Sequence, residues 1–179
     1  LDHLPQEYPS YGSGDHRISA IKVRFADGTV ACDLRYKSCE TVEGKYSIPG
    51  LPALYGDDNI PGDTLKLTLE DTTGQIRVIL YYGVMEELDI ITRAAEVKNI
   101  GQKKCTLERV MSACMDEVTA DQDWISFYGR HAAERLPQRR HLGHGIQSVG
   151  STRGSSSHQY NPFMILCDKT ATERQGNCY

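Results

Sequence analysis

The residues best suited to chemistry lie in one polar stretch, from Tyr128 to Phe163. It carries five arginines against a single acid, Glu134, in a chain of 179 residues whose net charge is −4. Most of the stretch has neither helical nor strand period, which predicts a long irregular loop, and such loops usually bind or catalyse. The arginines are Arg130, Arg135, Arg139, Arg140 and Arg153.

Two obvious uses of this stretch are disfavoured. His131, His141 and His144 have a spacing that matches no strong metal motif, and the neighbouring arginines repel a cation, so we expect hydrogen-bonding histidines and no metal. Nucleic-acid binding requires several spread cationic contacts, whereas the chain has a pI near 5.9 and only Tyr128 and Tyr160 as flanking aromatics. We expect no nucleic-acid partner.

No motif for a nucleophile, a phosphate loop or paired catalytic carboxylates is present, so we predict no catalytic residue and no cofactor in this chain. The six cysteines form no C-x-x-C pair, and no secretory signal precedes them. We therefore expect reduced thiols in a cytoplasmic protein.

Asp33 and Arg35 lie two residues apart on a predicted strand, so they share one face of it. A carboxylate and a guanidinium supply the charge-assisted hydrogen bonds that polar ligands such as sugars require. A solvent-facing ion pair of little energetic value has the same pattern, and the pattern alone favours this second interpretation.

Alternating apolar and polar residues predict the elements that position these groups. We expect hairpins over residues 18–37, 65–82 and 88–111, the first turning at Asp27-Gly28, and short strands at 124–128 and 163–166. Residues 47–63, rich in Pro and Gly, are predicted to be a loop.

This pattern favours a single all-β domain, an antiparallel sandwich. No apolar run is long enough to span a membrane, so no membrane partner is expected. The chain has no initiator Met and ends on Asn-Cys-Tyr, which we interpret as the ends of a piece cut from a longer protein.

Several long motifs resemble the N-terminal domain of glycoside hydrolase family 36 α-galactosidases, the melibiose- and raffinose-cleaving type. The resemblance extends over nearly the whole chain. Its motifs are QEYPSYGSGD (6–15), VRFADGTVACDLRY (23–36), PGLPALYGD (49–57), TRAAEVKN (92–99), TLERVMSACMD (106–116) and the whole of 128–163.

The resemblance implies a galactose-mutarotase-like β-supersandwich that is truncated at both ends and fills residues 1–179. It implies a parent enzyme that removes terminal α-linked galactose with retention, through two carboxylates on a (β/α)8 barrel that is absent here. A C-terminal β-domain, also absent, follows the barrel in this family. The chain alone is then inactive, and its partners are an α-galactoside, its own barrel and further copies in a homo-oligomer.

The resemblance also implies a substrate-binding role for Asp33 and a weaker one for Lys45, because loops of this domain border the active site of another subunit. Arg35 is added because it shares a strand face with Asp33. The arginine stretch is then a docking surface, and without its partner we expect much of residues 132–157 to be mobile or held by non-native contacts. An alternative is a stand-alone carbohydrate-binding module, for which the single tryptophan, Trp124, lies in a strand pattern typical of core residues.

Overall fold

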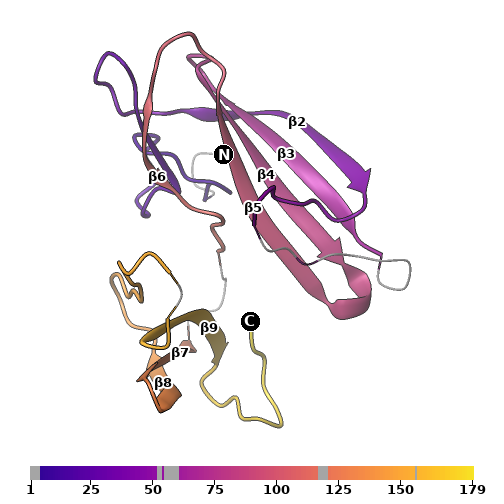
Figure 1. The fold of residues 1–179 in the computed structure, drawn as a ribbon, viewed down its shortest axis with the longest axis vertical. Coiled ribbons are helices and arrows are strands. Elements are labelled where there is room, and N and C mark those ends of the chain that lie inside the picture. Colours follow the sequence, from indigo (N-terminus) through magenta and orange to yellow (C-terminus); the bar gives the residue numbers. More distant parts are fainter. Residues whose placement is uncertain (1–4, 52–53, 55–60, 117–120, 156) are drawn as a thin grey trace. The chain divides into compact units, whose positions relative to one another are not determined.

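The computed structural model of the chain describes residues 5–51, 54, 61–116, 121–155 and 157–179. It divides into two compact units, Leu1–Asp116 and Glu117–Tyr179, and each is described by itself. Both are built from antiparallel strands, which confirms the predicted all-β class (Figure 1). In the described residues no helix is long and apolar enough to cross a membrane.

The first unit contains two sheets. β1 (Ile21–Arg24) pairs with β6 (Thr106–Val110), and a four-stranded sheet has the order β2-β3-β4-β5. A 3-10 turn, Glu86–Leu88, joins the last two strands of that sheet. The four strands are β2 (Leu34–Glu43), β3 (Asp63–Asp71), β4 (Ile76–Met85) and β5 (Ile90–Asn99).

The core of this unit lies between the two sheets. Ile21 and Val23 of β1 are fully buried against Ile76, Val78 and Leu80 of β4. Leucines of β3 and small residues of β5 pack around the same cluster, because alternate residues of each strand point toward it. Burial of these side chains is the main force that holds the sheets together.

The hairpin predicted over residues 65–82 is confirmed by β3 and β4, which pair from Asp63↔Val84 to Glu70↔Arg77. The predicted turn is also present, since the amide of Gly74 donates to the carbonyl of Asp71 at 2.8 Å. Residues 52–53 and 55–60 of the predicted loop lie outside the described residues.

The other two predicted hairpins are wrong. The turn at Asp27-Gly28 forms, with the amide of Phe25 donating to the carbonyl of Thr29 at 2.9 Å, but its flanks do not pair with each other. One edge of β1 is occupied by Tyr11, whose amide donates to the carbonyl of Ile21, and the other edge pairs with β6. The strand after the turn, β2, pairs instead with β3.

The hairpin predicted over residues 88–111 fails for a similar reason. Asn99 and Gly101 form the expected turn, with the Gly101 amide donating to the Asn99 side chain at 3.0 Å. The strands on either side then enter different sheets, because β5 pairs with β4 and β6 pairs with β1.

The second unit is a three-stranded sheet of order β8-β7-β9. Its strands are β7 (Gln122–Arg130), β8 (Ala133–His141) and β9 (Tyr160–Asp168), so the strands predicted at 124–128 and 163–166 are confirmed within longer ones. The expectation that most of 128–163 is an irregular loop is wrong for residues 133–141, which form a regular strand paired with β7. The alternation of apolar and polar residues is not visible in this strand, because arginines occupy both of its faces.

Candidate carbohydrate-contact site

Asp33 and Arg35 form one exposed ion pair at the start of β2. The Arg35 Nε and Nη2 atoms lie 3.0 and 2.9 Å from the same carboxylate oxygen, Oδ2 of Asp33. The side chains are 37% and 73% exposed. The second carboxylate oxygen and the outer guanidinium nitrogen can therefore bind hydroxyl groups of a ligand.

A buried carboxylate fixes the position of Asp33. Asp71, only 3% exposed, accepts a hydrogen bond from the Asp33 amide at 3.0 Å. The amide of Thr72 donates to the carbonyl of Asp33 at 3.0 Å, and the amide and hydroxyl of Thr73 both bind the Asp71 carboxylate. The turn between β3 and β4 thus holds the backbone beneath the exposed pair.

Ion pairs also continue across the sheet from Arg35. Its neighbour on β3, Glu70, accepts from Arg77 at 2.6 Å and lies 3.3 Å from the Lys37 ammonium. The hydrogen bond from Arg77, with that from Lys37, holds the pKa of Glu70 below its usual range. Asp33 and Arg35 therefore belong to a charged face of the sheet, as expected if their spacing marks a solvent-facing ion pair.

Lys45 lies beyond the far end of β2 from Asp33, and the intervening ten-residue strand spans roughly 30 Å. Its ammonium donates to the carbonyl of Tyr46 at 2.7 Å and lies 3.8 Å from the centre of the Tyr46 ring. Partial burial lowers the pKa of Lys45. The structure brings Asp33 and Arg35 together but not Lys45, so a single small sugar cannot touch all three within one chain.

A second charged network, which the sequence did not reveal, joins three of the quoted motifs. Arg17 binds Asp15 at 2.7 Å and also Asp116, while Arg93 binds Glu7 at 2.5 Å and donates to the carbonyl of Cys114 at 2.6 Å. The hydrogen bond from Arg17 holds the pKa of Asp15 well below its usual range. The distribution of charge along the chain gave no signal for this network, because the Arg93–Glu7 and Arg17–Asp116 pairs join residues 86 and 99 positions apart.

The arginine stretch is divided between internal and exposed roles. Arg139 binds the Asp123 carboxylate at 2.5 Å and donates to the carbonyls of Asp168, Lys169 and Ala171 at 2.7–3.0 Å. It is therefore a structural clamp within its own unit rather than a free docking group. Arg140, its neighbour in sequence, makes one exposed contact, to Gln138 at 2.6 Å.

The histidines of the stretch form no cluster. His141 lies 3.3 Å from Asp123, through Nδ1 and Oδ1. Within the part of the chain that the structure describes, no group of three or more His, Cys, Asp or Glu side chains is placed to hold a metal ion.

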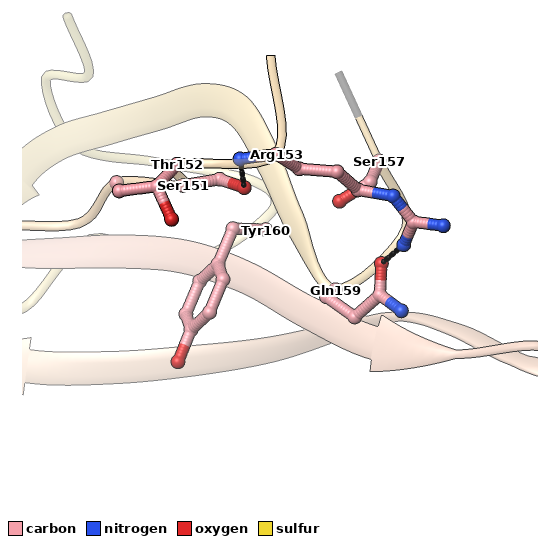
Figure 2. Close-up of a pocket in the computed structure, with 7 residues that line it drawn as sticks. Ser151, Thr152, Arg153, Ser157, Gln159 and Tyr160 are labelled. Carbon is pink, nitrogen blue, oxygen red and sulfur yellow. Dashed lines mark hydrogen bonds between the residues drawn. The ribbon is translucent and has the colours of Figure 1, made fainter. Parts of the chain in front are cut away.

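A shallow hollow follows the clamp, where the chain turns back toward β9. Figure 2 shows the Tyr160 ring beneath the 151–153 segment and the Arg153 guanidinium extended to Gln159, with an Nη1–Oε1 distance of 2.8 Å. The Ser157 hydroxyl is buried and has no hydrogen-bond partner among the described residues. The hollow is lined mostly by polar residues and by one aromatic ring, that of Tyr160.

Comparisons with known proteins agree with the motifs. The model of the Glycosyl hydrolase family 36 N-terminal domain matches residues 1–179. The chain is 48% identical over its full length to the bifunctional α-galactosidase/sucrose kinase AgaSK of Mediterraneibacter gnavus, and 42% identical to α-galactosidase AgaA of Geobacillus stearothermophilus. It spans 19% and 25% of those two proteins.

Solved structures show the same likeness. The crystal structure of an AgaA variant in complex with stachyose matches 99% of this chain, and 25% of its own, with a TM-score of 0.94 at 42% identity. The galactosidase domain of AgaSK matches 97% of this chain, and 24% of its own, with a TM-score of 0.90. The chain therefore belongs to the N-terminal domain family of glycoside hydrolase family 36.

Proposed function

We propose that this chain is the non-catalytic N-terminal domain of an α-galactosidase that removes terminal α-linked galactose from melibiose- and raffinose-type oligosaccharides with retention. The family membership supports this proposal, as do the structures of the relative AgaA in complex with raffinose and with stachyose. Because the chain spans about a quarter of such relatives, the activity belongs to a longer protein.

In this proposal the two catalytic carboxylates of a retaining glycosidase lie outside residues 1–179. Among the described carboxylates, Asp33, Glu70 and Asp123 are ion-paired with arginines, and the buried Asp71 is held by hydrogen bonds from backbone amides. A purified fragment of residues 1–179 should release no chromophore from an aryl α-galactoside, whereas the full-length protein should. Turnover by the fragment, free of contaminating enzyme, would overturn this part of the proposal.

The domain borders the substrate site of the assembled enzyme, and the Asp33–Arg35 pair is the observation that carries this role. The Arg35 guanidinium can donate charge-assisted hydrogen bonds and the Asp33 carboxylate can accept them. The backbone at Asp33 is held in place by the buried Asp71. A fixed polar pair suits the outer hydroxyls of an oligosaccharide, because little conformational freedom is lost when the ligand binds.

Lys45 is a second candidate substrate contact, at the other end of β2 and separate from the Asp33–Arg35 pair. Exposed arginines outside the clamp, such as Arg140 and Arg153, support contacts between subunits, because guanidinium groups bind carboxylates in a fixed orientation. The assembly is a homo-oligomer in this proposal. Sedimentation of the full-length protein as a monomer would contradict it.

The test of the sugar contact is kinetic and uses the full-length enzyme. Asp33→Asn should raise KM for stachyose about 10-fold, because a charge-assisted hydrogen bond is worth about 1.5 kcal/mol or more. KM for an aryl α-galactoside, which lacks the outer sugars, should stay the same. Glu40→Gln, which changes an exposed acid on the same strand paired with Lys66, is the matched control.

The same fold change in KM for both substrates in Asp33→Asn, relative to the parent enzyme, would show that Asp33 has only a structural role. The alternative of a stand-alone carbohydrate-binding module is disfavoured by Trp124, which is only 7% exposed and offers no open stacking platform. Millimolar or tighter binding of raffinose by the isolated fragment, in an NMR titration, would favour that alternative.

A further inference from the structure

Two cysteines face each other across a short ladder at the edge of the second unit. Cys167 lies near the end of β9, and residues 177–179 run antiparallel beside it, so that Cys178 is its direct partner. Leu166 and Tyr179 exchange both backbone hydrogen bonds, at 2.9 and 2.7 Å. Both thiols are free in this structure.

The position of this pair within the ladder suits a covalent bond. The amide of Asp168 donates to the carbonyl of Asn177 at 3.1 Å, so hydrogen-bonded positions flank the cysteine pair on both sides. The pair itself is therefore a non-hydrogen-bonded one, in which the Cα atoms are about 4.5 Å apart and both side chains project from the same face. Disulfides span Cα separations of about 4.4–6.8 Å, so the two sulfurs can be joined without moving the backbone.

The intervening turn is already ordered by contacts that do not involve sulfur. The Ala171 amide donates to the carbonyl of Asp168 at 2.9 Å, and Thr172 donates to Gln175 at 2.8 Å. The Asn177 side chain donates to the Asp168 carboxylate at 3.1 Å. Arg139 binds carbonyls of the same turn. Because these contacts hold the ladder closed, little further chain entropy is lost when the two thiols are joined.

The two thiols differ in access. Cys178 is exposed, whereas Cys167 is 1% exposed, and burial raises the pKa of Cys167 while the nearby Arg139 cation opposes that shift. An external reagent therefore reaches Cys178 first, and Cys167 is placed to react second. This is the arrangement of an attacking and a resolving cysteine.

We propose that Cys167 and Cys178 form a redox-active dithiol site whose substrate is a small disulfide such as glutathione disulfide. The Cys178 thiolate attacks one sulfur of that disulfide, forms a mixed disulfide and releases one glutathione thiolate. Cys167 then loses its proton to solvent, attacks the Cys178 sulfur and releases the second glutathione. Two protein thiols are oxidised to one disulfide while one glutathione disulfide is reduced to two thiols.

The site is independent of the proposed function, because it uses no residue of the carbohydrate contact. The Cys167–Cys178 disulfide would link residues 177–179 covalently to β9. Cys39 provides an internal comparison, since it is also exposed but faces Leu67 across the sheet. An exposed thiol with an aliphatic partner can be capped by glutathione but cannot be resolved into an intrachain disulfide.

The test uses the full-length native protein, reduced and then equilibrated with glutathione buffers of graded ratio. Free thiols are blocked with N-ethylmaleimide before trypsin digestion and mass spectrometry. We expect the peptide that ends at Lys169 to be linked by a disulfide to the peptide that begins at Gln175, in a yield that follows the glutathione ratio. Cys39 should carry only glutathione or the blocking group.

Recovery of Cys178 as a free thiol or only as a glutathione adduct, at the level of Cys39, would overturn the proposal. Cys167→Ser should convert the linked product into a glutathione adduct on Cys178. Because Cys167 is buried and its replacement can disturb folding, Cys178→Ser is the second variant: it changes an exposed residue, and Cys167 should then remain an unmodified thiol. Glutathione on Cys167 in Cys178→Ser would contradict the assigned order of attack.

Discussion

The Asp33–Arg35 pair and the Asp123–Arg139 pair contain the same two chemical groups, yet the surroundings give them different roles. Arg35 has one carboxylate oxygen as its partner and a side chain that is 73% exposed. Arg139 has a carboxylate and three backbone carbonyls, and it joins β8 to the turn after β9. The number of fixed acceptors around a guanidinium, not the local density of arginine, therefore separates a structural clamp from an available binding group.

Gly129→Ala, at the β7–β8 turn, should have the largest effect on the second unit, although this turn lies at the opposite end of the hairpin from the Asp123–Arg139 pair. A Cβ atom at Gly129 would overlap the Ala133 carbonyl oxygen and lie 2.9 Å from the Glu134 Cα, and both are backbone atoms that cannot move alone. Overpacking of this kind costs about 1–3 kcal/mol. Urea unfolding followed by Trp124 fluorescence measures the loss.

Gly143→Ala is the matched control for that substitution, because the nearest atom to its Cβ is the flexible Gln147 side chain at 3.8 Å. The control should unfold at the same urea concentration as the parent. Equal midpoints for the two alanine variants would mean that the tight β7–β8 turn does not contribute to the stability of the second unit.

Arg139→Gln and Arg140→Gln test the clamp directly, since they remove the same charge at adjacent positions. Arg139→Gln should lower the melting temperature by several degrees, because it leaves the Asp123 carboxylate and three carbonyls without their donor. Arg140→Gln should be nearly neutral, as it loses one exposed contact. Equal melting temperatures in scanning calorimetry would remove the distinction between clamp and docking arginines.

Acid should weaken the clamp as Asp123 becomes protonated. The hydrogen bond from Arg139 lowers the pKa of Asp123 relative to the unfolded chain. A carboxyl group of this kind stabilises the fold above its unfolded pKa of about 3.9, and the contribution is lost as pH falls through the folded value. Asp123→Asn should therefore flatten the decline in stability below about pH 4, and a parallel decline in both proteins would contradict this.

The smallest effect is expected at the other pair. A double-mutant cycle of Asp33→Asn and Arg35→Gln should give a coupling of about 0.5 kcal/mol or less in urea unfolding, because exposed ion pairs contribute little to stability. A coupling above about 2 kcal/mol would show that the pair is a second clamp and not an available ligand contact.

The local alternation of apolar and polar residues was enough to predict much of the secondary structure. The sequence was sufficient to predict the β3–β4 hairpin, because the apolar residues of both strands alternate with polar ones on either side of a four-residue turn. Strands joined by a short turn also lose little chain entropy when they pair. The strand core of β7 and the shared face of Asp33 and Arg35 followed from the same period of two. The motifs over residues 6–116 and 128–163 also sufficed to recognise the family.

Long-range pairing was not predictable from the same signals. The turns at Asp27-Gly28 and at Asn99 form as expected, yet the strands beside them pair with distant partners, since β1 gains full burial of Ile21 and Val23 only between β6 and β4. Likewise Arg139 is one of five similar arginines in sequence, and only the return of β9 brings three carbonyls to it. The strand periods, the turns and the family can be inferred from the order of the residues. Which strands pair and which charges are enclosed depends on the folded chain, because both require burial among residues that are far apart in the sequence.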